Sequence, residues 1–287
     1  MNGFPKKLSR RGFLTLSAMS GLGSGFGYMR FLEPRWLHVR HQHIATGQDS
    51  GSAPLKLLQI SDLHASEVVS LEYIESALKL GLAENPGVIC LTGDFITSVY
   101  GQFDRYTEIM TMLSRHAPTF ACLGNHDGGK WAGNTYGYPT SDAVRKMLER
   151  AGIDLLHNQH RDLVIGSRKL RMVGLGDKWS AEMAPRIAFP RDSPSADERF
   201  KIVLSHNPDT KDELSGFPWD LMLSGHTHGG QLLVPLVGTP FAPVRDKRFV
   251  EGLHRWNNRW LHISKGVGNL HGLRLNCRPE VNILHLA

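Results

Sequence analysis

Cysteine is scarce in this chain, which has three among its 287 residues. Three cysteines cannot build the dense disulfide framework of a small secreted protein, and Cys90 and Cys122 lie in apolar runs that favour strands. We therefore expect buried free thiols. The sequence also lacks an internal repeat of fixed period, which argues against a solenoid or another repeat array.

Acidic residues are almost absent from the N-terminal end, where residues 1–40 hold seven Lys or Arg and Glu33 as the only acid. This segment therefore accounts for the whole net charge of +6, and the rest of the chain is balanced with 26 basic and 26 acidic residues. A nucleic-acid-binding domain normally carries a basic surface of its own. The charge distribution therefore indicates targeting, and we expect no nucleic-acid partner.

The first 30 residues have the pattern of a twin-arginine export signal. Residues 9–14 read S-R-R-G-F-L, and an uncharged, glycine-containing stretch follows them up to Met29. That stretch is only moderately apolar and suits the twin-arginine pathway better than a stable transmembrane helix. We expect the twin-arginine translocase as a partner, and a location in the periplasm or on the outer face of the cytoplasmic membrane. No A-x-A cleavage site is evident after Arg30, so an uncleaved N-terminus could also anchor the chain to the membrane.

The domain organisation follows from these patterns. Residues 1–53 are predicted to form the signal or anchor and a linker, and residues 54–287 a single catalytic domain. In the linker we expect His38, His41 and His43 to be solvated. From Leu55 onward, short apolar runs alternate with helical patterns at 71–83 and 141–151, as in layered α/β domains.

Polar residues that can bind a metal or a phosphate follow most of the apolar runs. Because open α/β sheets place their ligand crevices beyond the carboxyl ends of the strands, these residues can converge on one site. Asp62 and His64 are two positions apart and can address the same cation. In chain order the polar groups are Asp62 and His64, then Asp94, then Asn125, His126 and Asp127, then His206, and finally His226 and His228.

The donors in this set are oxygen and nitrogen atoms without a thiolate. Such a set suits Mn, Fe or Zn, as divalent or trivalent ions, and its size is sufficient for two of them. Glycines directly before Asp94, Asn125 and His226 would allow tight turns and a close backbone approach to the metal cluster.

These groups resemble the sequential motifs D-x-H, G-D, G-N-H-D/E, H and G-H-x-H of the calcineurin-like metallophosphoesterases. The resemblance covers the chain from about Leu55 to its end, and it implies a four-layer α/β sandwich of two mixed β-sheets flanked by helices. It further implies a first metal held by Asp62, His64, Asp94 and His228. The second metal would be held by Asp94, Asn125, His206 and His226, with the Asp94 carboxylate bridging the two ions.

The resemblance also implies a mechanism. A hydroxide that bridges two cations would attack the phosphorus, because metal coordination lowers the pKa of water from about 15.7 towards about 7. In the family, the histidine at the position of His126 stabilises the transition state or protonates the leaving oxygen. We expect Asp127 to orient His126.

At a finer level, the export signal and the segments 225–231 (GHTHGGQ) and 273–281 (LRLNCRPEV) resemble the small exported bacterial phosphodiesterases of the YaeI and YkuE type. This resemblance predicts hydrolysis of phosphodiesters, in lipid headgroups or envelope polymers. An alternative is the pyrophosphatase reaction on UDP-2,3-diacylglucosamine of the lipid A pathway, which requires a cytoplasmic catalytic domain. A second alternative is an exported binding module without turnover, although the complete ligand set gives no sign of lost activity.

Three loops are expected to border the substrate site, at residues 128–139, 177–199 and 235–248. Their aromatic residues indicate either an apolar pocket wall or ordinary loop packing. These residues are Trp131, Tyr136, Tyr138, Trp179 and Phe241.

Overall fold

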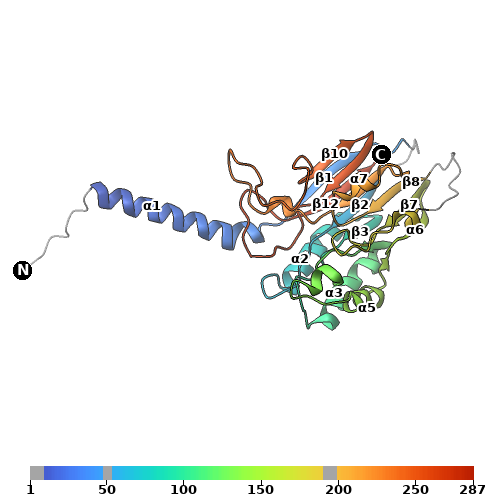
Figure 1. Ribbon diagram of the computed structural model, residues 1–287, viewed down its shortest axis with the longest axis horizontal. Helices are drawn as coiled ribbons and strands as arrows, with labels where there is room; N and C mark the ends of the chain where they lie inside the picture. Colours follow the sequence, from blue (N-terminus) through green and yellow to red (C-terminus); the bar gives the residue numbers. More distant parts are fainter. Residues whose placement is uncertain (1–9, 48–53, 190–198) are drawn as a thin grey trace, which may run out of the picture.

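The computed structural model describes residues 10–47, 54–189 and 199–287, and within α1 it leaves the side chains of residues 12–18 and 22 undescribed. Two six-stranded sheets form the centre of the catalytic domain (Figure 1). The first sheet has the order β1 (His38–Ile44), β12 (Glu280–Leu286), β2 (Leu55–Ile60), β3 (Val88–Thr92), β4 (Thr119–Cys122) and β5 (Asp154–Leu155). The second has the order β10 (Gly252–Trp256), β11 (Arg259–Ile263), β9 (Leu221–Ser224), β8 (Phe200–Leu204), β7 (Arg168–Gly174) and β6 (Gln159–Ile165).

Both sheets are mixed. Strands β2 to β5 are parallel, and β12 runs antiparallel to β2. In the second sheet β11, β9, β8 and β7 are parallel, whereas the outer strands β10 and β6 are antiparallel to their neighbours. The predicted sandwich of two mixed sheets is therefore confirmed.

The helices cover the outer faces of the sheets. Among the helices packed on the sheets, the longer ones are α2 (Leu71–Leu82), α3 (Phe103–His116) and α5 (Asp142–Arg150), which lie together on the side of the first sheet (Figure 1). The short ones are α4 (Lys130–Gly133), α6 (Pro185–Ala188), α7 (Thr210–Glu213) and the 3₁₀ turn η3 (His228–Gly230). Helix α2 begins as the sequence predicts, because the Ser70 side chain accepts a hydrogen bond from Tyr73 N and so caps the first turn.

Alternation along the strands divides the apolar core into layers. On β2, Leu57 packs between the two sheets, while its neighbour Leu58 packs against the helices outside the first sheet. Val88 and Ile89 of β3 divide in the same way, as expected for side chains that alternate between the faces of a strand. The three cysteines are buried and unpaired, as predicted.

The segment that we expected to be a linker contains part of the folded domain. Residues 38–44 form β1, which pairs with β12 in parallel over its whole length. The polar side chains of this edge strand hid its pattern, because only Val39 and Ile44 face the core. His41 and His43 are exposed on the strand. The boundary at residue 54 therefore does not coincide with the edge of the folded unit.

Ahead of β1, a π-turn η1 (Tyr28–Leu32) and a 3₁₀ turn η2 (Glu33–Arg35) pack against the C-terminal part of the chain. The Glu33 carboxylate is buried and accepts a hydrogen bond from Cys277 N. Arg274 N donates to Met29 O at 3.0 Å. These contacts fix the point at which helix α1 (Arg10–Gly27) leaves the domain (Figure 1).

The predicted export motif lies only partly within the described residues. Ser9 lies outside them, and Arg10 and Arg11 begin α1. Over the residues described, no helix combines the length and the apolar character that a membrane crossing requires.

Candidate metal centre

The site forms where strands of both sheets end. Asp62 and Asp94 follow β2 and β3, Asn125 follows β4, and His206 and His226 follow β8 and β9. Because these strands are parallel within each sheet, their carboxyl ends meet at one edge, as the sequence pattern predicted. The structure thus gathers polar groups that lie up to 166 positions apart in the sequence.

The backbone at the site is held in a conformation that non-glycine residues rarely adopt. Five of the seven predicted ligands have positive φ angles in the left-handed region. Residues held there cost about 1–3 kcal/mol each and persist where the surrounding structure enforces them, most often at functional sites. The five are Asp62 (52°), His64 (49°), Asp94 (57°), His226 (69°) and His228 (51°).

Two glycines allow the loops to approach the carboxylates. A Cβ atom on Gly124 would lie 2.2 Å from Asp94 Oδ1, and one on Gly225 would lie 2.2 Å from Asp62 Oδ2. Both distances are far inside van der Waals contact, so no other residue fits at either position without a shift. The expected role of these glycines is a close backbone approach, and the structure shows it.

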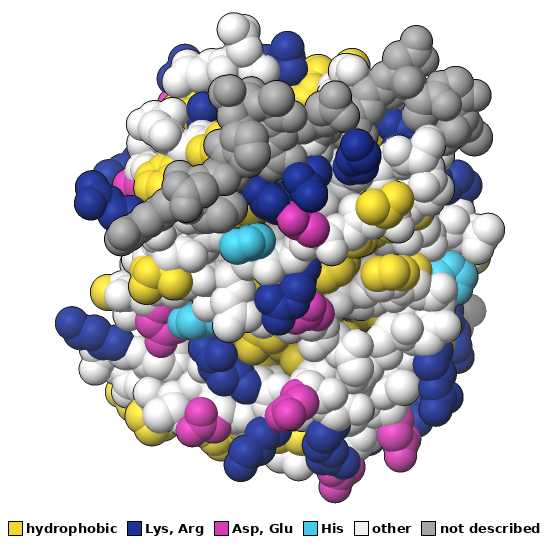
Figure 2. Space-filling model, turned by 90° about the vertical axis from the view of Figure 1, so that its right-hand side faces the viewer, with side chains coloured by type: hydrophobic (Ala, Val, Ile, Leu, Met, Phe, Trp, Pro, Cys, Tyr) yellow, Lys and Arg dark blue, Asp and Glu magenta, His cyan; other side chains and the backbone are white. Residues whose placement is uncertain are grey.

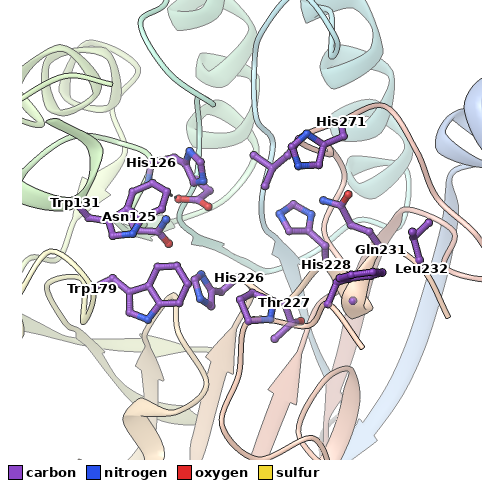
Figure 3. A pocket seen from close by; sticks show the side chains of 15 residues that line it. Asn125, His126, Trp131, Trp179, His226, Thr227, His228, Gln231, Leu232 and His271 are labelled. Carbon is purple, nitrogen blue, oxygen red and sulfur yellow. Dashed lines mark hydrogen bonds between the residues drawn. The ribbon is translucent and has the colours of Figure 1, made fainter. Parts of the chain in front are cut away.

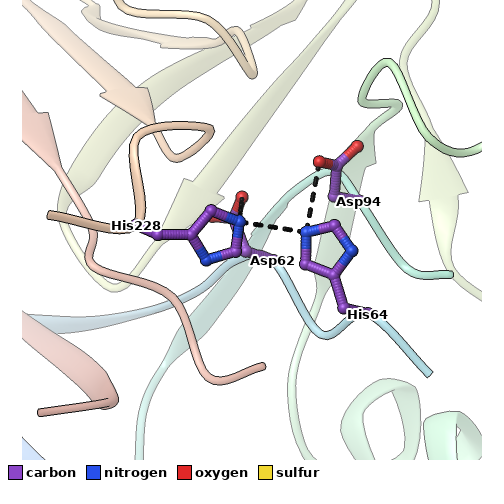
Figure 4. A group of neighbouring side chains, drawn as sticks. All are labelled: Asp62, His64, Asp94 and His228. Carbon is purple, nitrogen blue, oxygen red and sulfur yellow. Dashed lines mark hydrogen bonds and ion pairs between the residues drawn. The ribbon is translucent and has the colours of Figure 1, made fainter. Parts of the chain in front are cut away.

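The first group of ligands is compact and buried (Figure 4). Asp62, His64, Asp94 and His228 each offer one donor atom, and all four atoms lie within 4.8 Å of one another. His64 Nε2 lies 3.0 Å from His228 Nε2 and 3.4 Å from Asp94 Oδ2. His228 Nε2 lies 3.4 Å from Asp62 Oδ1. Two nitrogens and two carboxylate oxygens that converge in this way can surround one cation.

A second group lies on the other side of Asp94. His206 Nε2 is 3.1 Å from Asp94 Oδ2, and His226 Nδ1 is 3.3 Å from His206 Nε2. Asn125 lines the same cavity as Asp94 and His226 (Figure 3), and its buried Oδ1 has no hydrogen-bond partner among the described residues. A buried carbonyl oxygen without a partner is costly unless a ligand completes it. The structure therefore brings all seven predicted ligands together.

The ionisation states of His64, His228 and Asp94 suit cation binding. Burial lowers the pKa of His64 to about 3 and holds the pKa of His228 well below its usual value, so both imidazoles are neutral. Burial acts to raise the pKa of Asp94, but the surrounding histidines, His206 first, hold it well below the usual range. Burial likewise acts to lower the pKa of His206, yet Asp94 and Asp62 bring it to about 10. Asp94 is thus the ionised carboxylate at the centre of the cluster.

Several histidines are oriented by contacts on the ring nitrogen that faces away from the cluster. His206 Nδ1 donates to Thr92 O at 2.7 Å, and His64 Nδ1 lies 3.3 Å from Thr97 Oγ1. Such partners fix the orientation of the ring so that Nε2 faces the cluster. His206 would release its Nε2 proton when it binds a metal. These contacts, the unpartnered Asn125 oxygen and the thiolate-free donor set all fit a metal centre.

His126 lies beside the cluster and faces the cavity (Figure 3). Its backbone N donates to Asp94 Oδ1 at 2.9 Å, and its ring Nδ1 donates to Thr97 O at 2.6 Å. With Nδ1 committed to a carbonyl, Nε2 is the ring atom left for a substrate. Thr97 contacts two site histidines. No sequence pattern pointed to it, because it contributes a carbonyl and a hydroxyl from a loop.

Asp127 does not orient His126, contrary to our expectation. Its carboxylate is fully buried and accepts hydrogen bonds from the backbone amides of Gly124 (2.8 Å), Asp94 (2.9 Å) and Phe95 (2.6 Å). Asp127 therefore ties the loop after β4 to the loop after β3, and it positions the backbone that carries Asn125 and Asp94. It is a positioning residue, and Thr97 orients the ring of His126.

A cavity of about 400 Å³ opens beside the cluster (Figure 3). Trp131, Trp179 and Phe241 line it, as the apolar-wall alternative predicted. Tyr136 is exposed, and Tyr138 bonds to the backbone of Tyr100 away from the cavity, so these two aromatics belong to loop packing. The wall also includes Gln231, the last residue of the segment 225–231, and two residues that no sequence pattern pointed to, Leu232 and Leu270.

Several known proteins are similar to this chain in sequence. A family model described as calcineurin-like phosphoesterase matches residues 55–230. The chain is 42% identical to the phosphodiesterase YaeI of Escherichia coli over 97% of this chain and 99% of that protein. It is 28% identical to the metallophosphoesterase YkuE of Bacillus subtilis over 98% of both chains. It is 25% identical to the UDP-2,3-diacylglucosamine pyrophosphatase LpxG of Chlamydia trachomatis over 80% of this chain and 83% of that protein.

Proposed function

The chain belongs to the calcineurin-like phosphoesterase family and is a metal-dependent phosphoester hydrolase. We propose that it hydrolyses phosphodiesters at a centre of two metal ions. The observation that carries the two-ion proposal is the position of Asp94 Oδ2, which lies 3.4 Å from His64 Nε2 and 3.1 Å from His206 Nε2. A carboxylate shared between two donor groups is the bridging ligand that paired cations about 3.5–4 Å apart need. Asp62, His64 and His228 would complete one site, and Asn125, His206 and His226 the other.

The cavity favours a diester over a monoester. None of the described residues that line it is Lys or Arg, and aromatic side chains form much of its wall. A monoester carries more negative charge and a single organic group, whereas a diester carries less charge and a second organic group that needs apolar contact. The similarity to a phosphodiesterase at 42% identity over nearly the whole of both chains supports the same choice.

Metal ions bound here would activate water and neutralise charge on the phosphoryl oxygens. The residues of the chain supply the other parts of the reaction. His126 would hold a proton at Nε2 and donate it to the departing oxygen, while its Nδ1 stays bonded to Thr97 O. Trp131 and Trp179, whose ring centroids are 5.7 Å apart, would position an organic group of the diester and exclude water on one side.

The location is part of the proposal. The motif around Arg10 and Arg11 supports export by the twin-arginine translocase, and with it action on phosphodiesters of the cell envelope. Fusion of residues 1–54 to a reporter, expressed in cells with and without the translocase, tests this. Export that needs the translocase and is lost on replacing both arginines by lysine is expected. A reporter that stays in the cytoplasm whether or not the translocase is present would favour the alternative reaction, hydrolysis of UDP-2,3-diacylglucosamine. The chain is 25% identical to the chlamydial pyrophosphatase of that name.

The reaction is tested with the full chain. We expect Mn²⁺-dependent cleavage of bis(p-nitrophenyl) phosphate that exceeds cleavage of p-nitrophenyl phosphate. Asp94→Asn removes the shared charge and should lower kcat by about 10³-fold. Metal analysis should show two ions per wild-type chain and fewer in the variant.

Asp104→Asn is the matched control, since this aspartate is exposed on α3, and it should retain both activity and metal. A wild-type protein that binds one ion at full activity, or that prefers the monoester, would contradict the proposal.

A further inference from the structure

A charge-free loop stands at the mouth of the cavity. It comprises residues 231–243, which we call the rim loop, and it contains no Asp, Glu, Lys or Arg. Several of its apolar side chains are in solvent, with relative exposures of 108% for Leu236, 68% for Val237 and 71% for Phe241. Exposed apolar residues that gather in one segment mark an interaction surface more often than residues that are scattered singly.

Hydrogen bonds hold the rim loop in this position. Val234 and Gly238 exchange two backbone bonds of 2.9 Å, which closes a tight turn with Leu236 and Val237 at its tip. The base of the loop is tied to the C-terminal segment, where Leu233 N donates to Leu275 O at 2.8 Å and Leu275 N donates to Gln231 O at 2.9 Å. The apolar tip is thus displayed by a fixed turn.

The rim loop connects the cavity to the N-terminal part of the chain. Leu232 and Phe241, which lie near the two ends of the loop, line the cavity. At its base, Arg274 lies next to Leu275 and donates its backbone N to Met29 O. Figure 1 shows that this loop and helix α1 lie on the same side of the domain.

A second charge-free segment therefore lies near the first. Residues 12–29 contain no charged residue, and the described side chains Met19 and Phe26 of α1 are exposed. Phe31 and Leu32, which follow in η1, are exposed as well. The opposite face of the molecule differs. In the part of it that is not drawn in grey, Lys and Arg are interspersed with Asp and Glu, and apolar side chains are scattered (Figure 2).

Basic side chains accompany this apolar surface. Arg30 and Arg35 donate only to backbone carbonyls, of Gly272 and Phe31, and within the described part of the chain neither pairs with a carboxylate. Both line a small cavity of about 190 Å³ beside Tyr73. Glu67 lines this cavity as well, but it forms no ion pair with either arginine. Apolar side chains beside arginines without a paired carboxylate suit a surface that offers both acyl chains and phosphates.

We propose that this side of the protein docks on an anionic lipid bilayer, with the tip of the rim loop inserted among the acyl chains and Arg30 and Arg35 facing the lipid phosphates. The cavity then opens at the bilayer surface, where the phosphodiesters of lipid headgroups are its substrates. The substrate class rests on the proposed phosphodiesterase function, whereas the docking does not. A bilayer fits better than a protein partner because the displayed tip is a narrow projecting turn rather than a flat patch.

Docking is tested with a fluorophore on the tip of the loop. The full chain carrying Leu236→Cys is labelled with an environment-sensitive dye, since the native cysteines are buried. We expect a blue shift of the emission on addition of phosphatidylglycerol/phosphatidylcholine vesicles, and a smaller shift in high salt or with phosphatidylcholine alone. The matched control is Glu149→Cys, on the exposed face of α5, which should show no shift. Equal emission at both positions, or no shift at residue 236, overturns the docking.

The substrate class is tested with Leu236→Ser combined with Val237→Ser, neither of which lines the cavity. Hydrolysis of a phosphatidylglycerol headgroup in vesicles should fall about tenfold, because two inserted apolar side chains are lost. Hydrolysis of the soluble chromogenic diester should not change. If hydrolysis in vesicles is unaffected, the proposal that the inserted loop brings lipid headgroups to the cavity is refuted. If the wild type cleaves no soluble diester, the proposed function fails, and the fluorescence result still decides the docking.

Discussion

The floor and the rim of the cavity are built in opposite ways. The floor consists of the seven predicted metal ligands, and all of them are buried. The rim consists of Trp179 and the loop 231–243, where Trp179, Leu236 and Phe241 are exposed. Backbone angles, close glycine contacts and hydrogen bonds hold the floor in place. The comparison teaches that the buried polar residues of the floor and the exposed apolar residues of the rim lie in separate parts of the chain.

A polar layer supports the floor from below. His262 Nδ1 donates to Gln59 Oε1 at 2.6 Å, and Gln59 Nε2 donates to Ser224 O at 2.9 Å and to Thr92 Oγ1 at 3.2 Å. Gln59 and Thr92 belong to the first sheet, and Ser224 and His262 to the second. These bonds join the sheets directly beneath Asp62, Asp94 and His226, so they fix the distance between the two groups of ligands.

The largest effect on activity within this comparison is expected at His126, where the floor meets the cavity. His126→Ala keeps the backbone bond to Asp94 but removes the proton donor, so kcat should fall by about 10²–10³-fold for an alkyl diester. The loss should be smaller for a p-nitrophenyl diester, whose leaving group needs less protonation. His116→Ala, at the exposed end of α3, is the control. Equal losses on both substrates would show that His126 acts in another way.

Asp127→Asn tests whether the floor depends on buried support. An amide has one acceptor oxygen, so its NH₂ group would face backbone donors that now bond to a carboxylate. We expect the free energy of unfolding to decrease by about 2–3 kcal/mol in urea titrations. Asp142→Asn, on an exposed turn of α5, should change it by less than about 0.5 kcal/mol. If the Asp127 variant is as stable as the wild type, the carboxylate of Asp127 does not stabilise the backbone of the floor.

The polar layer predicts a dependence of stability on pH. Burial lowers the pKa of His262 to about 3, whereas the unfolded chain has the usual value of about 6.5. The unfolded state therefore binds the extra proton first, and stability present above pH 6.5 is lost as the pH falls towards 3.

Between pH 7 and pH 5, the wild type should lose about 2 kcal/mol more stability than His262→Asn, which cannot bind this proton. Urea unfolding at both pH values measures the difference. Parallel losses in the two proteins would show that His262 is not a source of the acid sensitivity.

The smallest effect is expected at the rim. Trp179 packs edge-on against His226 with 4.2 Å between the ring centroids, and Trp179→Ala should raise KM for an aryl diester about fivefold with little change in kcat. Tyr136→Ala on a neighbouring loop should have no effect, because this residue is exposed outside the cavity. A fall in kcat with unchanged KM would show that Trp179 acts in the reaction step, like the residues of the floor, and not in substrate binding.

The sequence predicted the layers and the gathering of the ligands because both depend on local pattern. Apolar runs predict strands, and polar residues after parallel strands meet at one edge, as Asp62, Asp94 and His226 do.

The role of Asp127 was not predictable, since its partners are backbone amides that only the folded loops bring together. Strand β1 was missed because an edge strand with few apolar residues has a weak alternating pattern. The exposed tip at Leu236 was missed because apolar composition does not tell a buried loop from a displayed one.

Strand β1 has one more consequence, which concerns solubility. It pairs with β12 along residues 280–286, whose side chains include Val281, Ile283 and Leu284. Removing β1 would leave the N–H and C=O groups of an apolar strand open to pairing with another chain, which is a route to aggregation. In the intact chain the outermost strand instead presents Arg40, His41 and His43, and charged or polar residues discourage such pairing. A shortened protein that begins at Leu55 would therefore self-associate, even though all seven ligands are still present.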